Sequence, residues 1–524
     1  MTNQAVADGV LNKQSLRKII FASSAGTLIE WYDFYIFGAL AVTLSGVFFP
    51  KGAGAAALLS TLATFAIGFV VRPFGALFFG YLGDLIGRKY TFMVTLLLMG
   101  GATFLIGVLP GFAVIGWAAP VMLIVLRLAQ GLALGGEYGG AATYVAEHCP
   151  DGERGYWTSW IQTTATLGLF VSLGVIIACR GMLTAEQFAA WGWRIPFWVS
   201  LVLVVFSYYI RRRMQESPLF SRMKAAGKGA KNPIKESFGN RANVKLVLIA
   251  LFGATAGQGV VWYTGQFYAM NFLKLVIGVE ATQAEYIMGI ALLMGTPFFI
   301  VMGKWSDKIG RKRIMLAGCV LGLVTYYPIY NAMLVVGNVD DPRRFVLRAE
   351  NIKAVGTPKV ETIAADASGG LQAKTITTIK EERTYDDGTR NLATMTRTRE
   401  GSGPETVVTK NSIRFPSLVS QPAVLLVLLI WIQVLYVTMV YGPIAAFLVE
   451  LFPTRIRYTS MSLPYHIGNG VFGGMVPFIG QLMIERTGIS LAGLWYPMAI
   501  CVVTIVVGIV FVRERRGVRM LEEH

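Results

Sequence analysis

Long apolar stretches alternate with short polar connections along most of the chain. A helix needs about 20 apolar residues to cross a lipid bilayer, and about twelve stretches reach that length. The pattern therefore predicts an all-α integral membrane protein, and a long polar stretch separates its ninth helix from its tenth. The predicted spans are residues 19–48, 55–82, 90–109, 118–146, 156–180, 194–212, 244–276, 282–306, 314–336, 421–450, 458–485 and 490–514.

Composition and charge agree with a membrane protein. The chain is 54% hydrophobic and 15% charged, whereas soluble domains carry about 25% charged residues. The net charge of +17 could indicate a nucleic-acid partner. However, Lys and Arg gather in the N-terminal tail, the connections between even and odd spans, and the C-terminal tail. Because short loops follow the positive-inside rule, we expect both termini in the cytoplasm and the basic surface against anionic lipid, with no nucleic-acid partner.

The cysteines and the N-terminus give no sign of a cofactor or a cleaved leader. The four cysteines, Cys149, Cys179, Cys319 and Cys501, are scattered along the chain without metal-type spacing. We therefore predict no metal, no cofactor and no disulfide in the polar insertion. The polar lead over residues 1–15 lacks the short apolar core of a signal peptide.

Two short motifs occur once in each half of the chain. The stretch GYLGDLIGRK returns as GKWSDKIGRKR, so that Asp84 corresponds to Asp307. The stretch AEHCPDGER returns loosely as VELFPTRIR, so that Glu147 corresponds to Glu450. The second spacing exceeds the first by about 80 residues, which is the length of the polar stretch. We therefore expect two six-helix bundles with one insertion.

The expected organisation has five parts. They are an N-terminal bundle (1–210), a cytoplasmic central loop (211–243), helices 7–9 (244–336), an extracytoplasmic insertion (337–420), and helices 10–12 with a cytoplasmic tail (421–524). Inside the insertion, polar and apolar residues alternate around Asp386-Asp387-Gly388. That pattern predicts a small β-hairpin or meander, with a flexible linker as the alternative.

The repeated loop motif has the form G-x-x-x-D-x-x-G-R-[RK], and RLAQG follows on the fourth helix at 127–131. On these motifs the sequence resembles the major facilitator superfamily. The stretches EWYDFYIFG, GGEYGGA, QESPLF and ELFPTRIRYTSMSLPYHIGNG resemble its metabolite–proton symporter branch. That branch includes permeases for α-ketoglutarate, citrate, shikimate, and proline or betaine. The resemblance leaves the insertion unexplained.

The loop motifs also have a physical interpretation of their own. Asp84 can accept hydrogen bonds from the amides at a neighbouring helix N-terminus, where the helix dipole favours a negative charge. Such a cluster can hold the cytoplasmic helix ends together in one state and release them in another; simple anchoring by positive charge is the alternative. The predicted cytoplasmic gate consists of Asp84, Arg88, Asp307, Arg311, Glu147, Arg154, Glu450 and Arg457.

Charged residues at membrane depth are confined to the N-terminal half. Such residues are costly in lipid and typically functional. The predicted proton-coupling acids are Asp33, Glu30 and Glu137, and the predicted anion-binding arginines are Arg72 and Arg127. A carboxylate paired with Arg stays ionised, and it can take a proton when the Arg turns to substrate. A permanent ion-pair cluster is the alternative, and the sequence does not say which acid carries the proton.

The corresponding helices of the C-terminal half offer neutral polar and aromatic side chains. Gln258, Trp262 and Gln266 recur at the spacing of one helical face. His466 could relay protons or be structural. Helix–helix hydrogen bonding is the alternative for each polar residue. The further predicted substrate-binding residues are Gln130, Gln258, Trp262, Tyr263, Gln266, Tyr465 and Asn469.

We therefore expect a secondary active transporter of the bacterial cytoplasmic membrane that carries a small organic acid together with protons. A proline- or betaine-type zwitterion permease is the alternative, with an aromatic ring facing the amine. A transporter-like sensor with a binding domain in the insertion is a third possibility. A channel or an enzyme is not expected, because the gate motifs imply alternating access and no catalytic constellation is present. We expect a monomer, and we expect deletion of about 340–418 to preserve transport.

Overall fold

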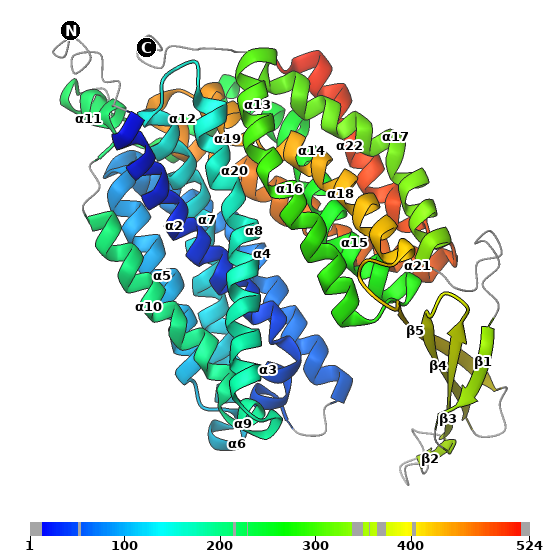
Figure 1. Ribbon diagram of the computed structural model, residues 1–524. Coiled ribbons are helices and arrows are strands. Elements are labelled where there is room, and N and C mark those ends of the chain that lie inside the picture. Colours follow the sequence, from blue (N-terminus) through cyan, green and yellow to red (C-terminus); the bar gives the residue numbers. More distant parts are fainter. Residues whose placement is uncertain are drawn as a thin grey trace.

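The computed structural model describes residues 13–50, 54–212, 216–227, 229–337, 349–355, 357–363, 374–400 and 405–514. The predicted cytoplasmic tails, 1–12 and 515–524, lie outside these residues. Figure 1 shows two groups of helices side by side, one from each half of the chain. The short helices α11 and α12 lie at one end of the body, and a small β-sheet lies at the opposite end.

Ten helical segments within the described ranges are long and apolar enough to cross a membrane, judged by length and composition alone. Most follow the predicted apolar stretches closely. The two earliest predicted spans coincide with α2 and α4, which are not among the ten. The N-terminal half consists of α2 (Lys13–Ala39), α3 (Ala41–Phe48), α4 (Gly54–Leu85), α5 (Arg88–Val108), α6 (Phe112–Ile115), α7 (Ala118–His148), α8 (Arg154–Met182), α9 (Ala185–Ala190), η1 (Gly192–Arg194) and α10 (Ile195–Arg212).

The C-terminal half follows after the short helices of the central connection. The seventh predicted span, Arg241–Ile277 in the structure, contains three π-helical segments. A fourth lies in the eleventh predicted span, Thr454–Thr487. Such segments are rare and often lie at functional sites. The elements are α11 (Pro218–Ala225), α12 (Pro233–Phe238), α13 (Arg241–Ala250), η2 (Leu251–Thr255), α14 (Ala256–Tyr263), η3 (Thr264–Tyr268), α15 (Ala269–Asn271), η4 (Phe272–Ile277), α16 (Ala281–Ile309), α17 (Arg311–Gly337), α18 (Gln421–Tyr441), α19 (Ile444–Leu451), η5 (Thr454–Ile456), α20 (Arg457–His466), η6 (Ile467–Gly473), α21 (Val476–Thr487), η7 (Ala492–Leu494) and α22 (Trp495–Phe511).

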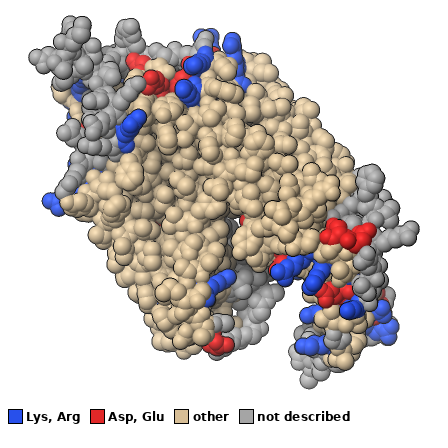
Figure 2. Space-filling model, in the orientation of Figure 1, with Lys and Arg blue, Asp and Glu red and all other residues tan. Residues whose placement is uncertain are grey.

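The surface of the helical body matches a lipid environment. Figure 2 shows a broad band without Lys, Arg, Asp or Glu between the two ends of the molecule. Charged side chains gather at the α11–α12 end and on the sheet. Apolar side chains such as Val202, Phe206 and Val506 are more than half exposed. In water such exposure would be costly, whereas in lipid it is the expected state.

The polar insertion folds as a five-stranded antiparallel sheet, which is larger than the predicted hairpin. The strands are β1 (Ala349–Ala354), β2 (Lys359–Ile363), β3 (Lys374–Tyr385), β4 (Arg390–Glu400) and β5 (Thr406–Arg414). Their order is β1-β3-β4-β5, and β2 also pairs with β3. The turn between β3 and β4 contains Gly388 at φ +78°, where a residue without a Cβ is favoured.

The sheet is joined to the helical body through β5. Ile413 donates its N–H to the carbonyl of Gly278 at 2.7 Å, and its carbonyl accepts from Glu280 N at 2.8 Å. The side chain of Gln283 forms two 2.8 Å hydrogen bonds with the backbone of Phe415. Ile413 and Phe415 are both buried in the apolar core of the C-terminal half. The expected deletion of about 340–418 would therefore remove two residues of this core, Ile413 and Phe415.

Candidate functional site

Asp84 joins the two halves at the cytoplasmic gate predicted from sequence. Its carboxylate, at the end of α4, accepts hydrogen bonds from the first turn of α20, from Thr459 N at 2.8 Å and Tyr458 N at 3.3 Å. The Thr459 hydroxyl donates to it at 2.8 Å. Arg88 pairs with Asp84 at 2.6 Å and donates to the carbonyl of Thr454 at 3.0 Å. A carboxylate at a helix N-terminus satisfies amides that lack a partner within the helix.

The second motif makes the same contacts in the opposite direction. Asp307, on α16, accepts hydrogen bonds from Gly155 N and Tyr156 N in the first turn of α8, both at 2.8 Å. Arg311 pairs with Asp307 at 2.5 Å and with Glu450 at 2.9 Å. Each half thus contributes one aspartate that caps a helix of the other half.

Two further ion pairs join residues of the predicted gate. Arg457 donates to Glu147 at 3.0 Å, and Arg154 lies 3.5 Å from Glu450. All four side chains are buried. The eight residues that the motifs predicted therefore lie in two equivalent clusters between the halves. We call these clusters the two latches, and both are closed in this structure.

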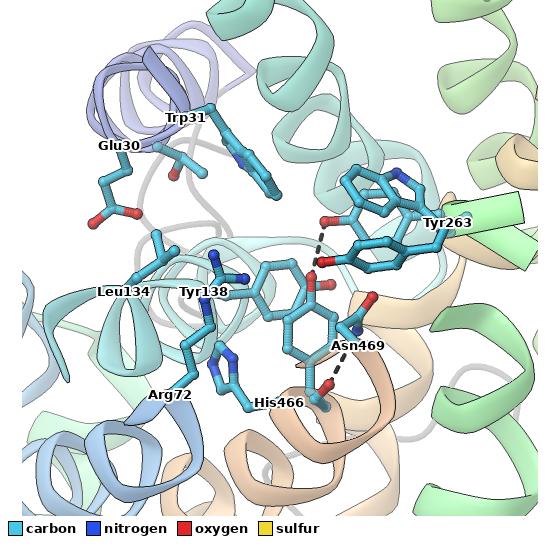
Figure 3. A pocket seen from close by; sticks show the side chains of 12 residues that line it. Glu30, Trp31, Arg72, Leu134, Tyr138, Tyr263, His466 and Asn469 are labelled. Atoms are coloured by element: carbon cyan, nitrogen blue, oxygen red, sulfur yellow. Dashed lines mark hydrogen bonds between the residues drawn. The ribbon is translucent and has the colours of Figure 1, made fainter. Parts of the chain in front are cut away.

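A cavity lies between the halves. It holds about 30 Å³ of free space, room for only a few water molecules. Figure 3 shows Arg72 and Glu30 on one side of it, and Tyr263 and Asn469 on the other. The lining residues are Thr27, Glu30, Trp31, Arg72, Leu134, Tyr138, Trp262, Tyr263, Tyr441, Tyr465, His466 and Asn469.

Aromatic rings from both halves meet in this cavity. Tyr138 stacks on Tyr465 with 3.6 Å between ring centroids, and the hydroxyls of Tyr441 and Tyr465 are 2.8 Å apart. Trp31 and Trp262 approach to 5.7 Å. Sequence reasoning named Trp262, Tyr263 and Tyr465 and missed the others. The aromatic run EWYDFYIFG was a signal for Trp31, but only its two acids were predicted as site residues.

Arg72 is the cation of the cavity. Its guanidinium lies over the rings of Phe34 and Phe69, at 5.0 and 4.3 Å from their centroids. Only 5% of the residue is exposed. In the described part of the chain it forms no ion pair, whereas five of the other six buried arginines do, namely Arg88, Arg154, Arg211, Arg311 and Arg457. An arginine that rests on aromatic rings and forms no ion pair is available to an anionic ligand.

Four predicted substrate residues do not line this cavity. Arg127 donates to Gln130 at 2.7 Å and lies over the Phe37 ring, and Gln130 donates to Thr103 at 2.6 Å. Gln266 is buried in the C-terminal half. Gln258 also lies outside the lining, where it forms a reciprocal amide pair with Asn469 at 2.9 and 3.0 Å. Their roles in substrate binding stay predictions.

The three predicted acids occupy different surroundings. Glu30 lines the cavity, and its Oε1 has no hydrogen-bond partner. Asp33 is fully buried beside the hydroxyl-bearing residues Thr103 and Ser200. Glu137 forms an ion pair with Arg211 and accepts from the Thr95 hydroxyl at 2.8 Å.

Arg211 is the functional candidate that sequence reasoning missed. The predicted loop 211–243 and the predicted span 194–212 both include it, and the structure places it in the last turn of α10. Its side chain is buried and returns into the N-terminal half, over the ring of Phe92. A long side chain at a helix end can extend several residues away from its own backbone position. Linear position along the chain therefore misplaces its charge.

His466 lines the cavity, and its Nε2 has no hydrogen-bond partner. Both predicted roles of His466, proton relay and structural residue, stay open.

The described residues contain no group of three or more metal-ligating side chains. All four cysteines are free.

Comparison with known proteins agrees with this architecture. The sugar (and other) transporter family matches residues 18–245. The shikimate transporter of Escherichia coli K12 is 36% identical over 332 residues, covering 62% of this chain and 74% of that protein. The proline/betaine transporter of Salmonella typhimurium LT2 is 34% identical over 337 residues, covering 63% and 67%.

A solved structure shows the same fold. The proton:xylose symporter XylE bound to 6-bromo-6-deoxy-D-glucose superimposes with a TM-score of 0.68 at 16% identity, over 97% of this chain and 98% of that one. This chain belongs to the major facilitator superfamily, and it is an integral membrane transporter of metabolites, not an enzyme.

Proposed function

We propose that this transporter carries a small organic carboxylate together with protons across the bacterial cytoplasmic membrane. The observation that carries the proposal is Arg72, a buried guanidinium that lines the cavity and forms no ion pair among the described residues. A guanidinium recognises a carboxylate through two parallel hydrogen bonds. The shikimate transporter is one relative, and its name describes such an acid.

The charge balance of the N-terminal half supports coupling to protons. The N-terminal half buries the acids Glu30, Asp33 and Glu137 and the arginines Arg72, Arg127 and Arg211, so these six charges sum to zero when all are ionised. Binding one carboxylate makes that sum negative, which is unfavourable in a medium of low dielectric. Uptake of one proton with the carboxylate restores neutrality. We therefore expect carboxylate affinity to rise as pH falls from about 8 to about 6.

A zwitterionic substrate is the second candidate. Trp31, Trp262, Tyr263 and Tyr465 surround the cavity with aromatic faces, which favour a quaternary amine. A proline/betaine transporter is among the relatives. A zwitterion brings no net charge, so its affinity would depend little on pH and strongly on Trp262.

The topology proposed for this function has twelve spans, with α2 and α4 added to the ten. The latches and α11–α12 lie on the cytoplasmic side, and the sheet lies outside. The basic residues near α11–α12 support this orientation through the positive-inside rule. The closed latches correspond to a state that is shut toward the cytoplasm.

Binding measurements decide between the two substrates. Shikimate and betaine are titrated onto the purified protein at several pH values, using wild type, Arg72→Lys and Trp262→Phe. The proposal predicts that shikimate binds more tightly at low pH and is lost in Arg72→Lys. Betaine binding that is independent of pH and lost in Trp262→Phe, without shikimate binding, would favour the zwitterion.

A further inference from the structure

Three charged side chains from three helices meet inside the N-terminal half, beside the cavity. They are Glu30 on α2, Glu137 on α7 and Arg211 on α10, and each is at most 2% exposed. The Arg211 guanidinium forms an ion pair with Glu137 and donates to the carbonyl of Phe92 at 2.8 Å. We call this group the acid pair with its arginine.

The surroundings of Arg211 leave room for this arrangement. A Cβ added to Gly26 of α2 would lie 1.6 Å from Arg211 Nη2, so the guanidinium occupies the space that a side chain would fill. The ring of Phe92 covers the guanidinium at 3.4 Å from its centroid. The Thr95 hydroxyl donates to Glu137 Oε2 at 2.8 Å. Arg211 and Glu137 are therefore held in one geometry.

The acid pair consists of the carboxyl groups of Glu30 and Glu137, and its arginine is Arg211. The Glu30 carboxyl lies within hydrogen-bonding range of Glu137, while Glu30 Oε1 has no partner. A hydrogen bond between two carboxyl groups requires a proton on one of them, because carboxylates are only acceptors. Two ionised carboxylates in contact would also repel each other. The geometry thus provides a site for one proton.

We propose that Glu30 and Glu137 share the transported proton, and that Arg211 is the fixed counter-ion of the remaining negative charge. This inference rests on the proposed function, and it assigns the proton among the three candidate acids. The proton enters and leaves at Glu30, which is the member that lines the cavity. No bond other than O–H forms or breaks.

Other ionisable groups face the acid pair from the helices around it. Asp33 is one turn away on α2, Arg72 of α4 interacts with Glu30, and Tyr458 of α20 lies near both carboxyls. Arg72 connects the proton to the substrate. When the Arg72 guanidinium binds a carboxylate ligand, it no longer offsets a charge on Glu30, so Glu30 keeps its proton while the ligand is bound. Figure 3 shows Glu30 and Arg72 on the same side of the cavity.

Infrared difference spectroscopy of the purified protein tests the shared proton without any substrate. Spectra of wild type, Glu30→Gln and Glu137→Gln are compared between about pH 5 and about pH 9. The control is Glu285→Gln, which removes an exposed carboxylate that pairs with Lys274 at 2.9 Å. We expect each cluster variant to lose one protonated carboxyl band, and the control to keep it.

Transport by reconstituted vesicles is measured on the same variants, with shikimate and betaine as probes. Glu30→Gln should lose at least tenfold in accumulation driven by a pH gradient and retain exchange of internal for external probe. Glu137→Gln leaves the buried Arg211 guanidinium without its ion-pair partner. If this single variant does not fold, the double variant Glu137→Gln/Arg211→Met is used in its place. The double variant should also exchange without accumulating.

The outcomes separate this inference from the proposed function. If Glu30→Gln keeps the wild-type carboxyl bands, or accumulates probe like wild type, the shared proton is excluded. If only Asp33→Asn loses accumulation, the proton belongs to Asp33 and the inference fails while symport stands. If wild type moves no proton with either probe, the proposed function fails, and the infrared spectra still decide whether the two carboxyls share a proton.

Discussion

The two halves of the molecule are alike at their latches and different in their interiors. Each latch has an aspartate that caps a helix of the opposite half, together with an arginine and a glutamate. In the interior, the charged side chains belong to the N-terminal half, and the C-terminal half supplies Trp262, Tyr263, Tyr441 and Tyr465. The repeated part is suited to conformational change, which needs both halves equally. The unrepeated part is suited to recognising charge.

The sheet, which only the C-terminal half carries, is a second difference between the halves. Deletions in it have the largest expected effect on folding and transport. Removing 340–418 takes away Ile413 and Phe415, whose side chains are buried in the helical core. Loss of a large core side chain costs ~2–5 kcal/mol, so we expect little folded protein. Removing 340–404 with a short Gly/Ser linker keeps β5 and should retain transport. Size-exclusion chromatography and vesicle uptake measure both deletions. Equal behaviour of the two would contradict the anchoring role of β5.

The contrast between Arg72 and Arg127 sharpens the account of the charged interior. Arg72→Lys keeps the charge and removes the planar fork, so carboxylate affinity should fall by about 10- to 100-fold, from the ~1.5–3 kcal/mol of charged hydrogen bonds. Arg127→Lys is the matched control, because Arg127 lies outside the cavity lining and donates to Gln130. Isothermal titration with shikimate compares the two. A larger loss in Arg127→Lys would move the binding site away from the cavity.

The likeness of the latches predicts matching effects of Asp84→Asn and Asp307→Asn. Each variant weakens a helix cap, worth ~0.5–2 kcal/mol, and so destabilises the state that is closed toward the cytoplasm. We expect a threefold to tenfold change in turnover, of similar size in both variants, with little change in affinity. Initial rates of uptake at several probe concentrations separate the two quantities. A large change in affinity, or an effect in one variant only, would break the symmetry.

A hydroxyl next to the acid pair provides the smallest expected effect. Thr95→Val removes the hydrogen bond to Glu137 with almost no change of shape. A charged hydrogen bond contributes ~1.5–3 kcal/mol, part of which the nearby Arg211 can offset. The pH at which uptake is half-maximal should therefore rise by less than about one unit, because the ionised form of the pair is stabilised less. Thr164→Val, on α8, serves as the control, because the Thr164 hydroxyl donates to the backbone carbonyl of Ile161 at 2.6 Å.

The motifs named residues that lie together in the two latches, and the depth argument named only part of the cavity lining; their roles in gating and binding stay predictions. Latch residues belong to a local motif that occurs twice, so Asp84 and Asp307 could be matched by alignment within the chain. Cavity residues depend on which way a helix faces. Depth along a helix, at about 1.5 Å per residue, placed Arg127 near the membrane centre and did not show that its side chain points into the N-terminal half.

Other parts of the site lie beyond what one sequence specifies. Arg211 sits at the end of a helix, and only the space beside Gly26 shows that its guanidinium turns inward. Trp31 and Tyr138 resemble ordinary apolar packing in a membrane helix, and their role depends on partners from the other half. The alternating pattern in the insertion predicted strands, but the number of strands depends on pairing between distant segments.

Simultaneous recording of shikimate uptake and proton movement in reconstituted vesicles tests the central claim most directly. The claim is that the charged interior of the N-terminal half couples a carboxylate to a proton. Without an imposed gradient, added shikimate should enter wild-type vesicles and make the outside medium more alkaline. Glu30→Gln should exchange shikimate without that change. Shikimate uptake by wild type with no proton movement, or proton movement undiminished in Glu30→Gln, would contradict the account.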